Sequence, residues 1–322
     1  MKEKIMENIA GKLGVPHIAE LLADRLSGSE LNSLLLEVFD RRTRNISPAL
    51  LLQQYQVNRF VHPSTTDMIS LLDWELQILR LLAGHAFRPV ELSPAAQWGS
   101  CSVLGPVDQK KIISATRNTE IMADATNSLA LYIAGIRRSG GTAASHPSDQ
   151  TSAGQPLRFC TVHRHVRAQE LKEKIHTAHF KIGCMVTGGR DSGSFGFEST
   201  HLLEHFKALD QLFRDVFGIS RIRFKLQRRE GYKEGALLME RVMDHLKKNI
   251  RTEIIFEDPP VTNNYYKGIQ YKMIIVVGDH EIEIADGGFV DWTQKLLEDN
   301  KERLLISGFG LEIMYRLLSE MV

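Results

Sequence analysis

One stretch of the sequence concentrates cationic side chains on what otherwise has the pattern of a β-strand. Residues 156–169, PLRFCTVHRHVRAQ, alternate apolar and polar residues, and the polar positions include Arg158, Arg164 and Arg167 as well as two histidines. Guanidinium groups on a rigid strand bind carboxylate and phosphate oxygens through paired N–H···O bonds. The pattern therefore indicates an anion-binding site, with a solvated charged strand face as the alternative interpretation.

The elements around this stretch form an α+β pattern. Residues 156–167 and the apolar segment 180–186, FKIGCMV, predict two strands of one hairpin. The remaining pattern predicts helices at 68–83, 199–217 and 233–249, a strand, a turn at ADATN and a helix within 111–135, strands near 252–256, 269–277 and 280–285, and a final strand, glycine turn and helix. We therefore expect a mostly antiparallel sheet flanked by helices.

The chain divides into two regions. Residues 1–60 predict a helical N-terminal region, in which one helix opens at Ser29 without a full capping box, and residues 61–322 predict the core. Within the core, the Ser/Gly/Ala-rich residues 138–155 predict a mobile loop, and residues 230–250 predict a helical insertion.

The composition excludes several classes of protein. The 322 residues include 40 basic and 39 acidic ones, so no overall positive field attracts nucleic acid or a membrane. Cys101, Cys160 and Cys184 are odd in number and lack a CxxC pair, which favours buried reduced thiols over a disulfide framework or a zinc site. No stretch reaches the roughly 18 apolar residues of a membrane span. We expect a soluble, cytoplasmic protein without a metal site or a membrane partner.

Three segments in sequence order resemble the catalytic core of class II aminoacyl-tRNA synthetases. They are the long helix with the extended stretch to Pro94, the strand–arginine–loop–strand that begins with PLRFCTVHRHVRAQ, and the final strand–Gly-x-Gly–helix. NNYYKGIQY and DGGFVDW further resemble the paired-tyrosine strand and double-glycine turn of the histidyl branch, which includes the regulatory subunit of ATP phosphoribosyltransferase. The resemblance covers roughly residues 62–322 and implies a homodimer built through residues 76–94.

The resemblance also implies roles for single residues. Arg167 matches the second-motif arginine, a catalytic residue that holds the α-phosphate of ATP and the carboxylate of an amino acid, and Phe180 matches the aromatic that stacks on adenine. The other residues that it implies are Gln169, His179, Gly308, Gly310, Glu312 and Arg316 at a nucleotide site, and Asp124, Thr126, Tyr265, Tyr266, Gly287 and Gly288 in an amino-acid pocket. An active enzyme of this kind would use ATP with Mg²⁺.

The sequence departs from the family pattern at several places. Ile313 stands where the third motif has an arginine for the γ-phosphate, and Arg316 lies three positions further on. Gln169 replaces the usual glutamate, PPVTNN lacks the extra arginine of the histidyl branch, and no anticodon-binding domain follows the last helix. These departures disfavour tRNA charging and tRNA as a partner.

Other residues admit a structural interpretation. His163, His165, His176 and His179 have no metal-ligand spacing and favour surface or loop positions. If Tyr265 and Tyr266 lie in a strand, they point to opposite faces, so at most one would face a ligand.

Two functional hypotheses follow from these observations. The first is a synthetase paralogue that binds an amino acid-like or nucleotide ligand, or a partner enzyme, without charging tRNA. The second is an ATP-dependent ligase that forms an aminoacyl-adenylate.

Overall fold

The computed structural model describes residues 2–140, 155–169, 177–258 and 265–319. The predicted mobile loop lies almost wholly outside these ranges, and so do His176 and the segment PPVTNN at 259–264. The elements that hold the candidate site lie inside the described ranges.

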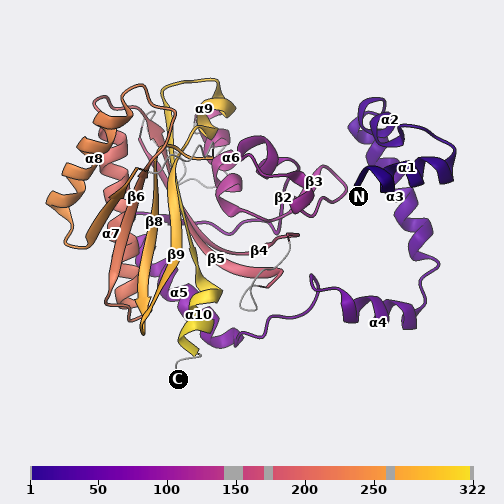
Figure 1. Cartoon of the computed structure of the whole chain (residues 1–322), viewed down its shortest axis with the longest axis horizontal. Coiled ribbons are helices and arrows are strands. Elements are labelled where there is room, and N and C mark those ends of the chain that lie inside the picture. The colour runs from indigo at the N-terminus through magenta and orange to yellow at the C-terminus, as the bar shows by residue number, and fades with distance from the viewer. Residues whose placement is uncertain (1, 141–154, 170–176, 259–264, 320–322) are drawn as a thin grey trace.

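An eight-stranded sheet forms the centre of the core (Figure 1). Its strands, in spatial order, are β1 (Arg88–Pro89), β4 (Leu157–Val166), β5 (His179–Arg190), β10 (Glu302–Gly310), β9 (His280–Val290), β8 (Lys267–Val277), β6 (Ile222–Arg228) and β7 (Glu253–Glu257). The β1–β4 and β6–β7 pairs are parallel, and the other neighbours are antiparallel. The predicted hairpin of β4 and β5 and the mostly antiparallel sheet are confirmed.

Helices cover both faces of this sheet. Phe159 and Cys160 follow one another in β4, so their side chains point to opposite faces, and each belongs to a different core cluster. The Cys160 cluster includes residues of α5 (Met68–Gly84), α7 (Gly196–Asp215), α8 (Gly235–Asn249) and α10 (Leu311–Ser319), and the Phe159 cluster includes residues of α6 (Ala125–Arg138) and α9 (Trp292–Leu297). All three cysteines are buried and unpaired, as predicted.

The predicted helical insertion at 230–250 contains α8, which packs on the sheet. Leu238, Val242 and Leu246 recur at intervals of four residues and are fully buried in the same cluster as α7. An apolar stripe of this kind fixes α8 against the core.

A small two-stranded sheet and two short turns of helix lead from α5 to α6. They are β2 (Ala95–Gln97), β3 (Thr119–Ile121), the π-helical turn η1 (Ser100–Leu104) and the 3₁₀ turn η2 (Gln109–Lys111). Glu120 of β3 is fully buried and accepts hydrogen bonds from the Gly99 amide at 2.9 Å and the Ser100 hydroxyl at 2.8 Å. These bonds tie η1 to the strand that leads into the N-terminus of α6.

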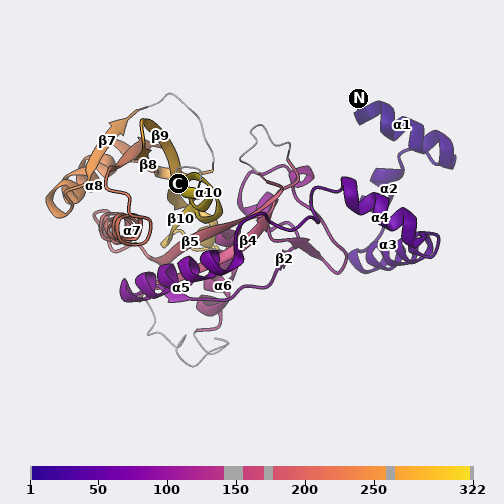
Figure 2. The ribbon, with the colours of Figure 1, turned by 90° about the horizontal axis from the view of Figure 1, so that it is seen from below.

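The N-terminal region consists of four helices that lie apart from the sheet (Figure 2). They are α1 (Lys2–Leu13), α2 (Ile18–Asp24), α3 (Gly28–Thr43) and α4 (Pro48–Val57), and no described side chain before Leu71 is buried. The expected start of α3 at Ser29 is wrong. Ser27 is the N-cap, and it forms a full capping box in which its hydroxyl accepts from the Glu30 amide and the Glu30 carboxylate accepts from the Ser27 amide.

Candidate functional site

A cavity of about 300 Å³ lies where β4, β5, β9 and β10 meet the N-terminus of α6 and the residues before β8. Its volume is at the low end of the roughly 300–1,000 Å³ that ligand pockets occupy. Its lining includes seven residues that the sequence assigned to a site, namely Asp124, Thr126, Arg167, Tyr265, Tyr266, Gly308 and Gly310. The fold therefore brings together residues that are far apart in the chain, since Asp124 and Gly310 are separated by 186 positions.

Arg167 supplies a cation to this cavity. It directly follows β4, its Nε donates to the Ala123 carbonyl at 3.3 Å, and its guanidinium lies 5.3 Å from the centroid of the Phe180 ring. No carboxylate of the described residues forms an ion pair with it. Arg167 thus keeps its charge for a partner that the described chain does not provide.

The other two arginines of this stretch lie in β4 and have internal partners. Arg158 forms two hydrogen bonds to the Glu204 carboxylate, at 2.8 and 2.9 Å. Arg164 contacts the Glu312 carboxylate at 3.0 Å. The three cations of the stretch therefore separate into two that stabilise the fold and one that faces the cavity.

Asp124 brings a carboxylate to the cavity from the N-cap of α6. Its Oδ1 accepts from the Thr126 amide at 2.9 Å, which fixes the start of the helix, and its Oδ2 accepts from the Tyr265 hydroxyl at 3.1 Å. These bonds hold the carboxylate in place without neutralising its charge.

A second carboxylate, that of Asp286 on β9, lines the same cavity. It accepts from the Tyr266 hydroxyl at 2.7 Å and from the Gln270 amide at 3.0 Å. Although its side chain is accessible to solvent, the surrounding protein raises its pKa, and the charge of Asp124 adds to the effect. Two acidic groups therefore act on one another within the site.

The expectation that the histidines lie at the surface is wrong for His163 and His165. Their exposed fractions are 8% and 1%, and His165 lines the cavity. Burial lowers the pKa of His165 to about 3, although Asp124 acts against this effect, so the imidazole is neutral. Its Nε2 accepts from the Ala125 amide at 3.2 Å, and its Nδ1 has no partner among the described residues.

Both tyrosines of the NNYYKGIQY segment line the cavity, contrary to the expectation that at most one would do so. Strand β8 begins at Lys267, so Tyr265 and Tyr266 lie in a bend before it and do not alternate between faces. Their ring centroids are 4.8 Å apart. Burial, together with the adjacent Asp124 or Asp286, raises both pKa values well above the usual range, so both hydroxyls act as donors.

This arrangement of sheet and helices occurs in solved structures of aminoacyl-tRNA synthetases. Histidyl-tRNA synthetase of S. aureus matches with a TM-score of 0.60 at 11% identity, over 81% of this chain and 70% of that chain. A Bacillus halodurans protein described as an ATP phosphoribosyltransferase regulatory subunit/histidyl-tRNA synthetase matches with a TM-score of 0.58 at 11% identity, over 81% and 83%. Histidyl-tRNA synthetase of Nostoc matches with a TM-score of 0.57 at 12% identity, over 82% of this chain and 75% of that chain.

The chain has the class II aminoacyl-tRNA synthetase fold. The fold that the sequence motifs implied is therefore confirmed. No family model and no curated protein sequence matches the chain. The described helices do not combine the length and the apolarity that crossing a membrane requires.

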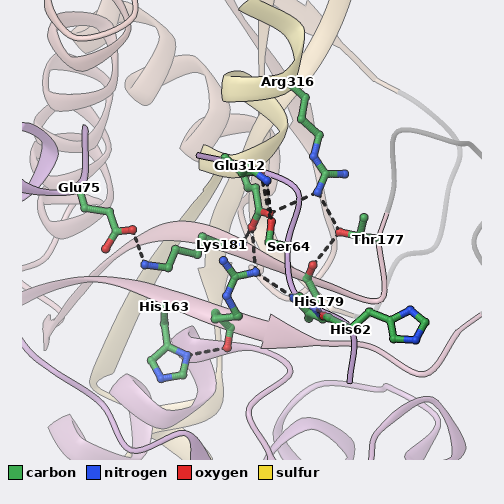
Figure 3. A network of polar contacts seen from close by, with 11 residues as sticks. His62, Ser64, Glu75, His163, Thr177, His179, Lys181, Glu312 and Arg316 are labelled. Atoms are coloured by element: carbon green, nitrogen blue, oxygen red, sulfur yellow. Dashed lines mark hydrogen bonds and ion pairs between the residues drawn. The ribbon is translucent and has the colours of Figure 1, made fainter. Parts of the chain in front are cut away.

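Several residues that the resemblance to class II synthetases places at a nucleotide site belong to a polar network beside the cavity (Figure 3). Glu312 has an exposed fraction of 1%, and its carboxylate accepts from the Arg164 guanidinium at 3.0 Å and the Lys181 amide at 2.9 Å. Its other donors include the hydroxyls of Ser64 and Thr66. This network, which we call the Glu312 network, ties the segment after the N-terminal helices to β5 and α10.

His179 and Arg316 take part in the same network. His179 donates from Nε2 to the His62 carbonyl at 2.6 Å, and its Nδ1 accepts from Arg164 at 2.9 Å. Arg316 contacts Glu312 at 3.3 Å and Thr177 at 3.4 Å and does not line the cavity. The nucleotide-binding roles of these residues stay predictions.

Gln169 and Phe180 also lie outside the cavity lining. Gln169 is exposed, and its carbonyl accepts from Arg59 at 2.8 Å. Phe180 is half-buried and presents its ring to Arg167. A nucleotide base on Phe180 would therefore lie next to the cavity rather than within it.

The glycines of the double-glycine turn and those of the final Gly-x-Gly differ in what lies beside them. A Cβ at Gly287 would lie 2.6 Å from the Tyr271 ring, and one at Gly288 would lie 2.8 Å from the Tyr266 ring, so these glycines admit protein side chains. A Cβ at Gly308 would approach only Ile182, at 3.8 Å, and that side chain also lines the cavity. Of these glycines, Gly308 is therefore the one beside open space in the cavity.

The sequence analysis missed several residues of the cavity. Among them are the charged Lys272, Glu283 and Asp286 and the neutral Cys184 and Ile182, and His165 had been assigned to the surface. The sequence did carry a signal for Asp286, because this residue directly precedes the double glycine, Gly287 and Gly288, that had been assigned to the pocket. The charged lining of the cavity thus becomes visible only in the fold.

The lining of the cavity contains charged side chains of both signs. Three carboxylates, Asp124, Glu283 and Asp286, stand against the cations of Arg167 and Lys272. Glu283 is paired with Lys272 and Lys225, so Asp124 and Asp286 are the lining carboxylates that have no ion-pair partner in the described chain. The described residues also contain no cluster of three or more His, Cys, Asp or Glu side chains that would hold a metal ion.

Proposed function

We propose that this protein binds an amino acid-like ligand in the cavity of a class II synthetase fold and does not charge tRNA. The observation that carries the proposal is the pair of opposite charges in one cavity: Arg167 at the end of β4 and Asp124 at the start of α6, neither of which has an ion-pair partner in the described chain. An α-amino acid carries a carboxylate and an ammonium group that complement them.

The size and the charge of the cavity support a single small ligand. A volume of about 300 Å³ accommodates an amino acid, and two unpaired carboxylates, Asp124 and Asp286, against the single unpaired cation of Arg167 disfavour a bound triphosphate. Ile313 at the position of the third-motif arginine removes a further cation that triphosphate binding in class II synthetases would use. These features support the absence of tRNA charging.

Calorimetry with the 20 common amino acids tests this proposal. We expect at least one to bind, and Arg167→Ala to lower its affinity by about tenfold or more, because a charge-assisted bond contributes roughly 1.5–3 kcal/mol. Arg158→Ala is the matched control, since it removes the same type of side chain from β4, the strand that directly precedes Arg167, but outside the cavity. Unchanged affinity in Arg167→Ala would contradict the proposal.

A second candidate is an ATP-dependent ligase that forms an aminoacyl-adenylate, with Mg²⁺. The guanidinium of Arg167 lies 5.3 Å from the Phe180 ring, so an α-phosphate on Arg167 and an adenine on Phe180 would be neighbours. Exchange of pyrophosphate into ATP that depends on an amino acid would favour this candidate over a binding protein. Absence of exchange with the amino acids that bind would exclude it.

The exposed face of α5 supports a homodimer as part of the proposal. Met68, Ile69, Leu72 and Leu76 are 45–72% exposed and recur along one helix. Sedimentation at micromolar concentration should give a dimer, and substitution of Leu72 and Leu76 by glutamate should give a monomer. A wild-type monomer would contradict this part.

A partner enzyme and a cytoplasmic location are also part of the proposal. One structural neighbour is described as an ATP phosphoribosyltransferase regulatory subunit/histidyl-tRNA synthetase, which supports a partner enzyme as an alternative to the small ligand. The three buried thiols are unpaired, which supports a reducing compartment such as the cytoplasm.

A further inference from the structure

The cavity contains more negative charge than the α-ammonium group of one amino acid requires. Asp124 and Asp286 both line it, and no cationic side chain in the described ranges forms an ion pair with either carboxylate. Their hydrogen-bond donors are an amide, side-chain hydroxyls and the Gln270 amide group, all of them neutral. Asp124 is half-buried and Asp286 is accessible to solvent, so Asp286 needs no partner within the fold and its charge is available to a second positive group of a ligand.

The nearest lysine is engaged elsewhere. Lys272 lies opposite Asp286 in the β8–β9 pair, but its Nζ bonds to Glu283. Glu283 also contacts Lys225, at 3.2 Å. These three side chains form a cross-strand group at the edge of the cavity. The charge of Lys272 acts against the rise in the pKa of Asp286, but Lys272 forms no ion pair with it.

The opposite side of the cavity has the features of an anion site. Arg167 has no carboxylate partner in the described chain, and His165, which lines the same cavity and is 99% buried, has an Nδ1 without a partner. Since Nε2 of His165 accepts from the Ala125 amide, the proton of the neutral ring is on Nδ1. A ligand carboxylate, or a water that it holds, would supply the missing acceptor.

A metal ion does not explain the two carboxylates. The described residues place no third histidine, cysteine or carboxylate where it would complete a metal site with Asp124 and Asp286. Tyr265 and Tyr266 direct their hydroxyls at these carboxylates and stay protonated, so they add hydrogen bonds and no charge. An organic cation fits this environment, because it tolerates such neutral donors around its counter-ion.

We infer that the cavity selects an α-amino acid with a second cationic group in its side chain, which Asp286 binds while Asp124 binds the α-ammonium group and Arg167 the carboxylate. Lysine, ornithine and arginine share this chemistry. The inference rests on the proposed function, because it takes the amino-acid-binding cavity as given, and it adds the class of side chain. Gly308, directly opposite Asp286 in the β9–β10 pair, leaves the space that this side chain needs.

The experiment compares matched ligands by calorimetry with the full chain. Lysine, ornithine and arginine each have the second cation, norleucine and glutamine do not, and cadaverine has two ammonium groups without a carboxylate. We expect the basic amino acids to bind about tenfold or more tightly than norleucine and glutamine, as a charge-assisted contact predicts. Cadaverine should bind more weakly than lysine, because it lacks the group that Arg167 holds.

Two variants test whether Asp286 causes the preference for basic amino acids. Asp286→Asn should remove the preference for lysine over norleucine, whereas Glu281→Gln, the same type of substitution on the same strand but outside the cavity, should retain it. Thermal unfolding of both variants checks that they are folded. The ligand series on the wild-type protein needs no variant, so it decides the inference even if Asp286→Asn does not fold.

The outcomes separate the inference from the proposed function. Binding of norleucine or glutamine as tight as that of lysine, or a preference that survives in Asp286→Asn, overturns the inference and leaves an amino-acid-binding protein. Failure of every amino acid to bind overturns the proposed function and the inference with it. Cadaverine that binds as tightly as lysine overturns the assignment of Arg167 to a carboxylate.

Discussion

Two polar clusters meet near the end of β4, and they differ in whether their charges are paired within the protein. In the Glu312 network, the carboxylate accepts from Arg164, the Lys181 amide and the hydroxyl of Thr66 (Figure 3). In the cavity, Arg167 and the two aspartates have no ion-pair partner in the described chain. Both clusters contain residues that the class II motifs assign to ligands.

This difference separates structural roles from binding roles. A buried carboxylate with five or so donors has no capacity left for a ligand, and its loss leaves several donors without an acceptor. Opposite charges that remain unpaired across a cavity destabilise the empty fold slightly and attract a ligand that neutralises both. Motif position alone would not have distinguished the two clusters.

The largest effect that we expect is a loss of protein stability when the Glu312 network is disrupted. Glu312→Ala removes the acceptor of Arg164 and of the Lys181 amide, so the free energy of unfolding should fall by about 3–5 kcal/mol. Urea unfolding followed by circular dichroism measures this change. Glu281→Ala, which removes an exposed carboxylate, should change stability by less than about 1 kcal/mol. Equal effects of the two substitutions would show that the network is not structural.

A second prediction addresses the space in the cavity. A Cβ at Gly308 would approach only Ile182, at 3.8 Å, so Gly308→Val should place its methyl groups in the cavity at little cost to the fold. Amino-acid affinity measured by calorimetry should fall about tenfold to a hundredfold, the range expected for an overpacked site.

Gly310→Ala provides the contrast for this substitution. Its Cβ would lie 2.4 Å from Ile313 Cγ2, so we expect a loss of stability. If Gly308→Val binds its ligand as the wild type does, the cavity is not the binding site.

The sequence revealed much of this architecture because its signals were local. Alternation along residues 156–167 predicted β4, and the glycine turn after the last strand predicted β10 and α10. Asp124 was found through the resemblance to class II synthetases, and the structure shows that it is also the N-cap of α6, a position that its residue type suits.

The partners of the charged side chains depended on contacts between distant segments. Arg158 and Arg164 look like Arg167 in the sequence, but their partners Glu204 and Glu312 lie 46 and 148 positions away. His165 is buried because the N-terminus of α6, 40 positions earlier, packs on it. Which cation would remain for a ligand was therefore decided by the tertiary fold.

The smallest effect on stability that we expect comes from loss of the Arg158–Glu204 ion pair, which joins β4 to α7. Burial acts to raise the pKa of Glu204, but hydrogen bonds from His201 and Arg158 outweigh it and lower the pKa to about 2. Because this pKa is below the unfolded value of 4.5, the pair contributes stability above pH 4.5 and loses it as the pH falls toward 2. The pair is partly exposed, so Glu204→Gln should cost about 1 kcal/mol at pH 7.

Thermal unfolding of Glu204→Gln and of the wild type between pH 7 and pH 3 measures this pH dependence. The difference between the two proteins should be constant from pH 7 to about pH 5 and should narrow below pH 4.5, where the wild-type contribution begins to disappear. Amino-acid affinity should not change, because Glu204 lies outside the cavity lining. A loss of affinity in this variant would mean that the paired arginines also act in binding, and the separation between the two kinds of charge would fail.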